Sequence, residues 1–205
     1  MDVVVVGVCG GSGSGKSSLA AALAENLGDD VVAVLPFDAY YHDLQHLELA
    51  ERVGVNFDHP DSVDAELFAS HLDALRMGTA VGVPEYDFTR HTRTGDHTLV
   101  EARPVVIAEG ILLLCDEVVS SRLDMTVFLD VPEPVRYRRR LARDTVERGR
   151  DEVDVLRQFT ESVAPMHDRF VQPFAHGADV VWQHPWDLRA AAERLTSLVD
   201  AIVPA

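Results

Sequence analysis

Residues 10–17 read Gly10-Gly11-Ser12-Gly13-Ser14-Gly15-Lys16-Ser17, and they fit the pattern G-x-x-x-x-G-K-[ST]. An apolar, β-branched run precedes them at residues 3–9, and a stretch with leucines four residues apart follows at residues 17–27. Strand, glycine loop and helix therefore occur in the order that a phosphate-binding loop requires. In such a loop the backbone N–H groups surround an anion, which also faces the positive end of the helix.

The only lysine of the chain lies in this loop, because 17 of the 18 cationic residues are arginines. Lysine is a compact point charge and arginine a planar fork, so we expect Lys16 to reach the β- and γ-phosphate oxygens of a bound nucleotide. The Ser17 hydroxyl is expected to bind Mg²⁺. A flexible Gly/Ser linker is the alternative. The residues expected to bind the nucleotide are Gly10, Gly11, Ser12, Gly13, Ser14, Gly15, Lys16, Ser17 and Ser18.

Length and composition indicate one globular domain over residues 1–205. No apolar run approaches the roughly 20 residues of a membrane span. Asp2 stands where a signal peptide would carry basic residues. The two cysteines, Cys9 and Cys115, lie in apolar runs, which favours buried thiols in a reducing compartment and predicts a cytoplasmic protein.

The formal net charge is −16, which disfavours binding to nucleic acids and to anionic membranes. Residues 133–150 differ, since seven arginines face three carboxylates there and give a local charge of +4. One basic segment on an acidic chain predicts a localised anionic ligand.

Apolar runs alternate with amphipathic segments along the chain. We expect strands at residues 3–9, 31–37, 104–108, 125–130 and 179–182, and helices at 17–27, 61–77, 134–148, 153–163 and 186–202. Residues 40–55 are expected to be irregular or helical, and residues 80–86 and 97–101 to form a hairpin. This alternation predicts an α/β fold with a parallel sheet. Ligands of such sheets bind beyond the carboxyl ends of the strands, where Gly10, Asp38 and Glu109 lie.

The phosphate loop alone does not identify the phosphate acceptor. GTP-switch proteins read guanine with an Asn-Lys-x-Asp motif, which this chain lacks because its only lysine is in the loop. A kinase acting on a small molecule is the simplest interpretation.

Seven segments resemble, in the same order, those of the uridine–cytidine kinases, which phosphorylate pyrimidine nucleosides at the 5′-hydroxyl. They are GGSGSGKSS (10–18), DAYY (38–41), NFDHPDSVD (56–64), PEYDFTRHTR (84–93), VVIAEGILLL (105–114), RRRLARDTVERGR (138–150) and VAPMHDRFVQP (163–173). The resemblance implies the P-loop NTPase fold of nucleoside-monophosphate kinases, with a five-stranded parallel sheet. It also implies a β-hairpin clamp at residues 80–101, a helical lid at 133–150 and a homotetramer.

The resemblance also implies roles for residues. Asp38 matches the general base that accepts the 5′-hydroxyl proton and helps to hold Mg²⁺, and Glu109 matches a second carboxylate on the metal. Arg143 and Arg148 match the lid pair that grips the phosphates of ATP, or of GTP as an alternative donor. A turn aspartate is the structural alternative for Asp38, and a helix-start residue for Glu109.

The same resemblance implies a pyrimidine ribonucleoside site. Asp58 matches the binder of the ribose hydroxyls, with Asp61 left as the cap of the helix near Ser62. The other implied contacts are Tyr86 and His91 at the C4 edge of the base, Phe57 and Phe88 stacked on its ring, Arg140 and Gln158 at the ribose, and Arg150 at the base. Hairpin packing is the alternative for the aromatic residues, and an exposed loop position for His91.

Some residues are left without a site role. Arg136, Arg138 and Arg139 are expected on a solvated helix face with Asp144 and Glu147 as partners. His42 and His46 are spaced like metal ligands but lack a third ligand, so we expect them on the surface. Met166-His167 and Gln172 receive no interpretation. Ala39 replaces a serine that is common in the family.

Two rival functions remain. One is a related kinase that acts on another small alcohol, such as a sugar phosphate or pantothenate. The other is a nucleotide-sensing module without catalysis, which Asp38, Glu109 and the lid arginines oppose, since a sensor does not need all of them.

Overall fold

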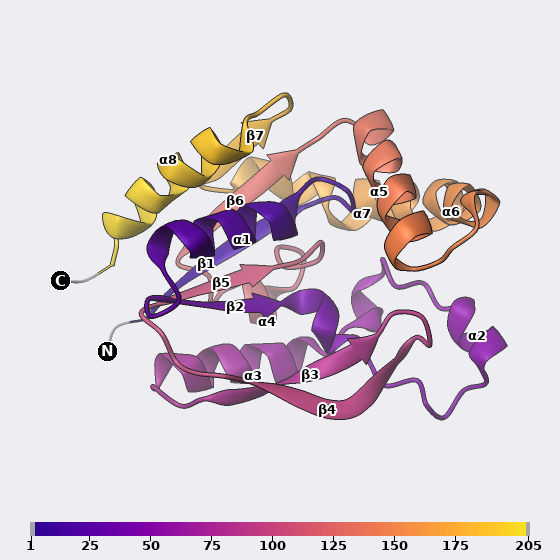
Figure 1. Ribbon diagram of the computed structural model, residues 1–205, viewed down its shortest axis with the longest axis horizontal. Helices are drawn as coiled ribbons and strands as arrows, with labels where there is room; N and C mark the ends of the chain where they lie inside the picture. Colours follow the sequence, from indigo (N-terminus) through magenta and orange to yellow (C-terminus); the bar gives the residue numbers. More distant parts are fainter. Residues whose placement is uncertain (1–2, 204–205) are drawn as a thin grey trace.

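The computed structural model describes residues 3–203, and its centre is a parallel sheet of five strands in the order β2-β5-β1-β6-β7 (Figure 1). The expected α/β fold with a five-stranded parallel sheet is confirmed. The strands are β1 (Val4–Gly10), β2 (Val32–Pro36), β5 (Val105–Glu109), β6 (Met125–Asp130) and β7 (Val180–Gln183). Asp2 and the ends of the expected domain (residues 1, 2, 204 and 205) lie outside the described residues.

Both faces of this sheet are covered, so its central strands are apolar throughout. Every residue of β1 and β5 is buried. Helices α1 (Lys16–Leu27) and α8 (Leu188–Asp200) pack on one face, where Leu23 and Leu195 meet in a common core. Helix α3 (Ala65–Arg76) packs on the other face through side chains such as Phe68. Two-sided burial favours continuous Val/Ile/Leu runs over alternation, which is why these strands were predictable.

The hairpin consists of β3 (Val81–Asp87) and β4 (Thr92–Val100), which pair antiparallel. The second strand was expected only from residue 97, and this boundary was wrong. Residues 92–96 are polar and lack alternation, but cross-strand pairing extends to Asp87↔Thr92. The Asp87 carboxylate closes the turn by accepting hydrogen bonds from the backbone N–H groups of Thr89 (2.8 Å) and Arg90 (3.0 Å).

The expected helix at residues 61–77 begins later than predicted. A 3₁₀ turn, Pro60–Ser62, comes first, and α3 begins at Ala65. Its cap is Asp64, whose carboxylate accepts from the Leu67 N–H at 3.1 Å, so the expectation of Asp61 as the cap was wrong. The irregular interpretation of residues 40–55 is confirmed, with one short helix, α2 (Leu49–Val53).

Three helical segments follow β6: α5 (Glu133–Glu147), α6 (Glu152–Gln158) and α7 (Ala164–Phe170), with a π-helical turn at Phe159–Val163. The expected apolar stripe over residues 153–163 was partly wrong. Val153 is 72% exposed, whereas Val155 is fully buried. The buried positions Val155, Phe159 and Val163 are four residues apart, so the buried face differs from the expected stripe. The remaining segments are α4 (Glu117–Ser120) and two 3₁₀ turns, Phe37–Tyr40 and Gln172–Gly177.

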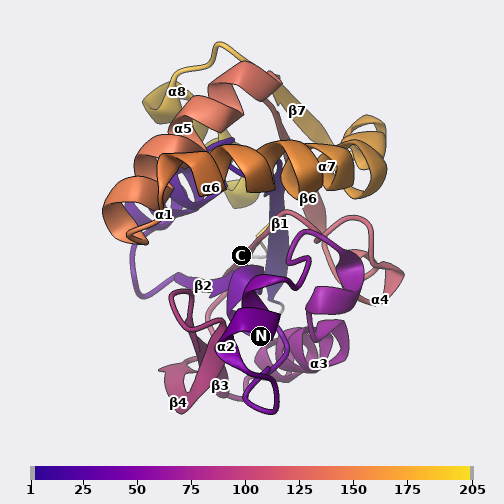
Figure 2. The same ribbon diagram turned by 90° about the vertical axis from the view of Figure 1, so that its right-hand side faces the viewer.

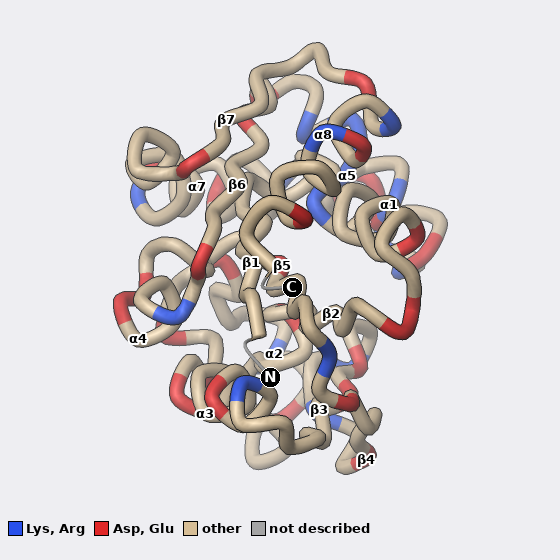
Figure 3. Tube along the Cα trace, turned by 90° about the vertical axis from the view of Figure 1, so that its left-hand side faces the viewer, with Lys and Arg blue, Asp and Glu red and all other residues tan. Residues whose placement is uncertain are grey.

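In the view of Figure 3, α1 and α4 carry one acidic residue each and α3 carries two. His42 and His46 are exposed as expected, and Cys9 and Cys115 are free thiols, of which Cys9 is buried.

Among residues 3–203, no helix has both the length and the apolar character needed to cross a membrane.

Candidate active site

The phosphate loop lies at the carboxyl edge of the sheet, between β1 and α1. Gly13 and Gly15 adopt positive φ angles of 80° and 101°, a region that glycine enters without strain. A Cβ atom at Gly13 would also collide with the carbonyl oxygen of Arg136. Lys16 is buried, and its Nζ donates to the Gly11 carbonyl at 3.3 Å. The loop is thus held by α5 behind it and by its own lysine.

Two carboxylates lie at the carboxyl ends of β5 and β2, on one side of the loop strand β1. Glu109 ends β5, is only 8% exposed and accepts a hydrogen bond from Ser17 Oγ at 2.9 Å. Burial raises the pKa of Glu109, although the Lys16 charge opposes the shift. Asp38 lies in the 3₁₀ turn after β2. Mg²⁺ takes oxygen ligands and is commonly held by one or two carboxylates together with substrate phosphates. Ser17, Glu109 and Asp38 fit that donor set.

A cavity of about 390 Å³ opens in front of the loop. Helices α5 and α6 lie on one side of it, and α2 with the β3–β4 hairpin lies on the other (Figure 2). The expected site residues that line the cavity come from segments far apart in the sequence. They are Ser12, Lys16, Ser17, Asp38, Phe57, Asp58, Tyr86, Phe88, His91, Glu109, Arg140, Arg143, Arg148, Arg150 and Gln158. The other loop residues expected to bind the nucleotide lie beside it in the phosphate loop, and Ser18 is exposed at the start of α1.

Aromatic rings form the hairpin side of the cavity. The His91 ring stacks on Phe57 with centroids 4.9 Å apart and planes inclined by 21°. Tyr86 contacts Tyr41 and Phe88 through tilted or edge-on packing. His91 is buried and has φ of +51°, a strained conformation for a residue with a side chain. Burial lowers the pKa of His91, so its imidazole is neutral at pH 7.

Asp58 lines the cavity together with the lid arginines. Its backbone N–H donates to Asn56 Oδ1 at 3.1 Å. None of the described residues donates a hydrogen bond to its carboxylate. Burial raises the pKa of Asp58, although the charge of Arg140 opposes the shift. This carboxylate is therefore available to a ligand that brings hydroxyl donors.

The arginines of α5, and Arg148 directly after it, differ in what they contact. Arg140 Nη1 donates to Ser12 Oγ in the phosphate loop at 2.8 Å, and the Arg148 guanidinium lies 4.6 Å from the Phe88 ring centroid. Arg136 was expected on a solvated face, and this was wrong. It is 2% exposed, and its Nε donates to the Val131 carbonyl at 3.0 Å, because this side of α5 faces the loop. Arg139 also reaches the loop, at the Ser14 carbonyl (3.1 Å), while Arg138 is exposed.

The structure adds residues that the sequence analysis did not assign to the site. Asp144, expected as a surface partner, is fully buried among arginines. His167 is buried, and its Nδ1 atom lies behind Gly11. The Ser162 hydroxyl donates to Asn56 Oδ1 at 2.7 Å, across the far end of the cavity. Asp144 and His167 lie in two of the segments that carry the family resemblance. Their place in these segments was the only indication in the sequence that they could belong to the site.

Comparisons with known proteins show which proteins the chain is similar to. Residues 5–187 match the model of the Phosphoribulokinase / Uridine kinase family. The chain is 40% identical to the uridine kinase of Chloroflexus aurantiacus over 98% of this chain and 97% of that protein. It is 44% identical to the uridine kinase of Deinococcus deserti over 97% and 96%.

Two solved structures share the fold. A putative fructose transport system kinase from Silicibacter has a TM-score of 0.72 at 24% identity and covers 88% of this chain and 90% of its own. A possible uridine kinase from Bacillus stearothermophilus has a TM-score of 0.62 at 19% identity, with 89% of each chain covered.

Proposed function

Since the chain belongs to the phosphoribulokinase / uridine kinase family and is a kinase, we propose that it transfers the γ-phosphoryl group of ATP to the 5′-hydroxyl of uridine or cytidine. One observation carries this proposal. The phosphate loop, the carboxylates of Asp38 and Asp58, and the rings of Phe57 and Phe88 all line the same cavity. The names of the curated relatives supply the nucleoside, and GTP is the alternative donor.

The donor end of the cavity is built for a triphosphate. Backbone N–H groups of the loop and the Lys16 charge bind the phosphates. Ser17, Glu109 and Asp38 would hold Mg²⁺, which would neutralise charge on the transferred group. Arg143 and Arg148, which line the same cavity, spread the charge that develops during transfer.

The acceptor end is built for a ribonucleoside. Asp58 accepts from the ribose 2′- and 3′-hydroxyls, and Arg140 and Gln158 contact the ribose. Phe57 and Phe88 flank the base, and Arg150, Tyr86 and His91 contact its polar edge. A neutral imidazole donates or accepts according to its tautomer, so His91 suits either the 4-oxo group of uridine or the 4-amino group of cytidine. The base and ribose then orient the 5′-hydroxyl toward Asp38.

Asp38 acts as the general base. In phosphoryl transfer with a loose transition state, the hydroxyl proton leaves late, so the carboxylate needs correct placement more than an elevated basicity. The lid residues 133–150 close over the cavity and exclude water, which limits hydrolysis of the donor. We also propose that residues 1–205 act as one cytoplasmic domain, as a homotetramer, without nucleic-acid or membrane partners.

The test is an ADP-release assay with uridine, cytidine, their 2′-deoxy forms, adenosine and pantothenate. The wild-type protein is expected to turn over uridine and cytidine in a Mg²⁺-dependent reaction. In Asp38→Asn this turnover should fall by about 100-fold or more, while the variant should still bind ATP. Turnover with pantothenate alone would favour the related-kinase alternative. ATP binding without transfer to any acceptor would favour the sensing alternative, and full activity of Asp38→Asn would refute the role of Asp38.

A further inference from the structure

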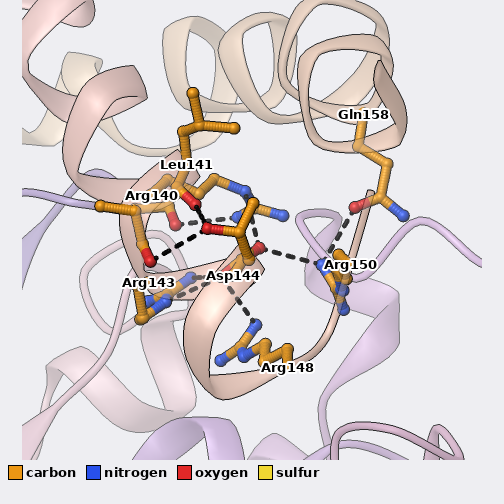
Figure 4. A network of polar contacts seen from close by, with 10 residues as sticks. Arg140, Leu141, Arg143, Asp144, Arg148, Arg150 and Gln158 are labelled. Atoms are coloured by element: carbon orange, nitrogen blue, oxygen red, sulfur yellow. Dashed lines mark hydrogen bonds and ion pairs between the residues drawn. The ribbon is translucent and has the colours of Figure 1, made fainter. Parts of the chain in front are cut away.

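The lid contains one buried carboxylate that holds four arginines. Asp144 is completely buried, and the side chains of Arg140, Arg143, Arg148 and Arg150 point toward it (Figure 4). Burial alone would raise the pKa of Asp144, but the surrounding guanidinium groups outweigh it, and the net shift is downward. Asp144 is therefore ionised at neutral pH and allows four mutually repelling cations to converge.

The two oxygens of Asp144 serve different partners. Oδ1 lies 2.7 Å from Arg143 Nη2 and 3.8 Å from Arg148 Nη1. Oδ2 lies 3.4 Å from Arg140 Nε and 3.1 Å from Arg150 Nη1. The chain brings Arg150 back to this point by turning at Gly149, whose φ is +61°, and the Arg150 N–H bonds to the Asp144 carbonyl at 3.0 Å.

The two arginines on Oδ2 also donate hydrogen bonds to other side chains that line the cavity. Arg140 continues to Ser12 in the phosphate loop at 2.8 Å. Arg150 continues to Gln158 Oε1 on the acceptor wall at 3.0 Å. Asp144 thus joins Arg143 and Arg148, the arginines proposed for the donor phosphates, to Arg140 and Arg150, the arginines proposed for the acceptor.

We propose that Asp144 is a positioning residue that couples donor binding to acceptor binding. Its four arginines leave three positive charges in excess of the Asp144 charge. Donor phosphates compete with Asp144 for Arg143 and Arg148, so the carboxylate holds Arg140 and Arg150 more closely when the donor is bound. An immobilised Arg150 loses less conformational freedom when the acceptor arrives, so the donor tightens acceptor binding, and linkage requires the reverse as well. This proposal rests on the proposed acceptor.

The test measures coupling between ligands, without turnover. Uridine binding is titrated by calorimetry with and without Mg²⁺ and a non-hydrolysable ATP analogue. The wild-type protein is expected to bind uridine at least about fivefold more tightly with the analogue present. In Asp144→Asn this ratio is expected to fall to about one. A purely structural role would weaken both ligands without changing the ratio.

Two further variants keep the result interpretable. Arg150→Gln leaves Asp144 and its other three arginines in place and removes one acceptor arginine, so it should also lose coupling, and it decides the matter if Asp144→Asn does not fold. Asp154→Asn is the matched control, because Asp154 pairs with Arg157 at 3.1 Å in an exposed ion pair on the neighbouring helix. It should retain coupling.

The outcomes separate this proposal from the proposed function. Coupling that persists in a folded Asp144→Asn or in Arg150→Gln overturns it, as does a wild-type ratio of one or loss of coupling in Asp154→Asn. Failure of wild-type protein to bind uridine or cytidine overturns the proposed function instead.

Discussion

Replacing Asp58 with asparagine should weaken the ribonucleoside site while relieving the folded protein of a partly buried charge. The side chain faces the cavity, and no described residue donates a hydrogen bond to its carboxylate. Asparagine has nearly the same shape but lacks the charge and one acceptor oxygen. The variant therefore separates ligand recognition from packing.

The expected loss of activity follows from one charge-assisted hydrogen bond to a ribose hydroxyl. Such a bond contributes about 1.5–3 kcal/mol, and about 1.4 kcal/mol corresponds to tenfold. The kcat/KM for uridine should therefore fall by about 10- to 150-fold. The loss should be smaller for 2′-deoxyuridine, which lacks one of the two hydroxyls, so the preference for ribose over deoxyribose should decrease.

The expected change in stability has the opposite sign. Burial raises the pKa of Asp58 above the ordinary 3.8, so the folded state binds this proton more tightly than the unfolded state. As the pH rises from 3.8 towards the raised pKa of Asp58 in the folded protein, this carboxylate progressively lowers the free energy of unfolding. At pH 7, Asp58→Asn should be as stable as the wild type or more stable, and this advantage should disappear in acid.

The assay combines steady-state kinetics with denaturant unfolding at pH 7 and pH 3.5. Asp73→Asn is the matched control. Hydrogen bonds from Arg122, at 2.8 Å to each Asp73 oxygen, lower the pKa of Asp73. The Asp73 side chain is 45% exposed, so its loss should destabilise the fold by no more than about 1 kcal/mol and leave the kinetics unchanged. An unchanged ribose preference in Asp58→Asn would refute the role of Asp58.

Three further predictions concern the phosphate loop and its support. Gly13→Ala should abolish ATP binding and destabilise the fold more than Gly78→Ala, because φ is +80° and +78° at the two sites but only Gly13 has backbone against the new Cβ; equal losses in denaturant unfolding would contradict this. Lys16→Ala should reduce kcat by about 100-fold or more in the ADP-release assay, and near-normal turnover would count against the lysine's role. Burial lowers the pKa of His167 to about 4 from an ordinary 6.5, so the wild type should lose stability by up to about 1.4 kcal/mol per pH unit between those values on acidification, and His167→Gln should lack this slope.

The family resemblance supplied most of the expected cavity wall, whereas the sequence by itself determined the phosphate loop and the five strands of the sheet, of which β7 is not buried. This was possible because these features depend on local constraints. Positive φ angles require glycine, a strand buried on both faces requires a continuous apolar run, and the carboxyl ends of parallel strands meet at one edge. Asp38 and Glu109 could be placed near the loop by that rule alone.

Only the tertiary structure decided which charged residues face inward. Arg136 and Arg138 both lie on α5 and look alike in the sequence, but one is buried behind the loop and the other is exposed. Asp144 and Glu147 are both acidic, yet only Asp144 meets four guanidinium groups. Helical periodicity determines which side chains share a face of the helix, but not which face packs against the rest of the protein. Burial of a charge is settled by partners brought from distant segments, because only those partners offset the cost of removing it from water.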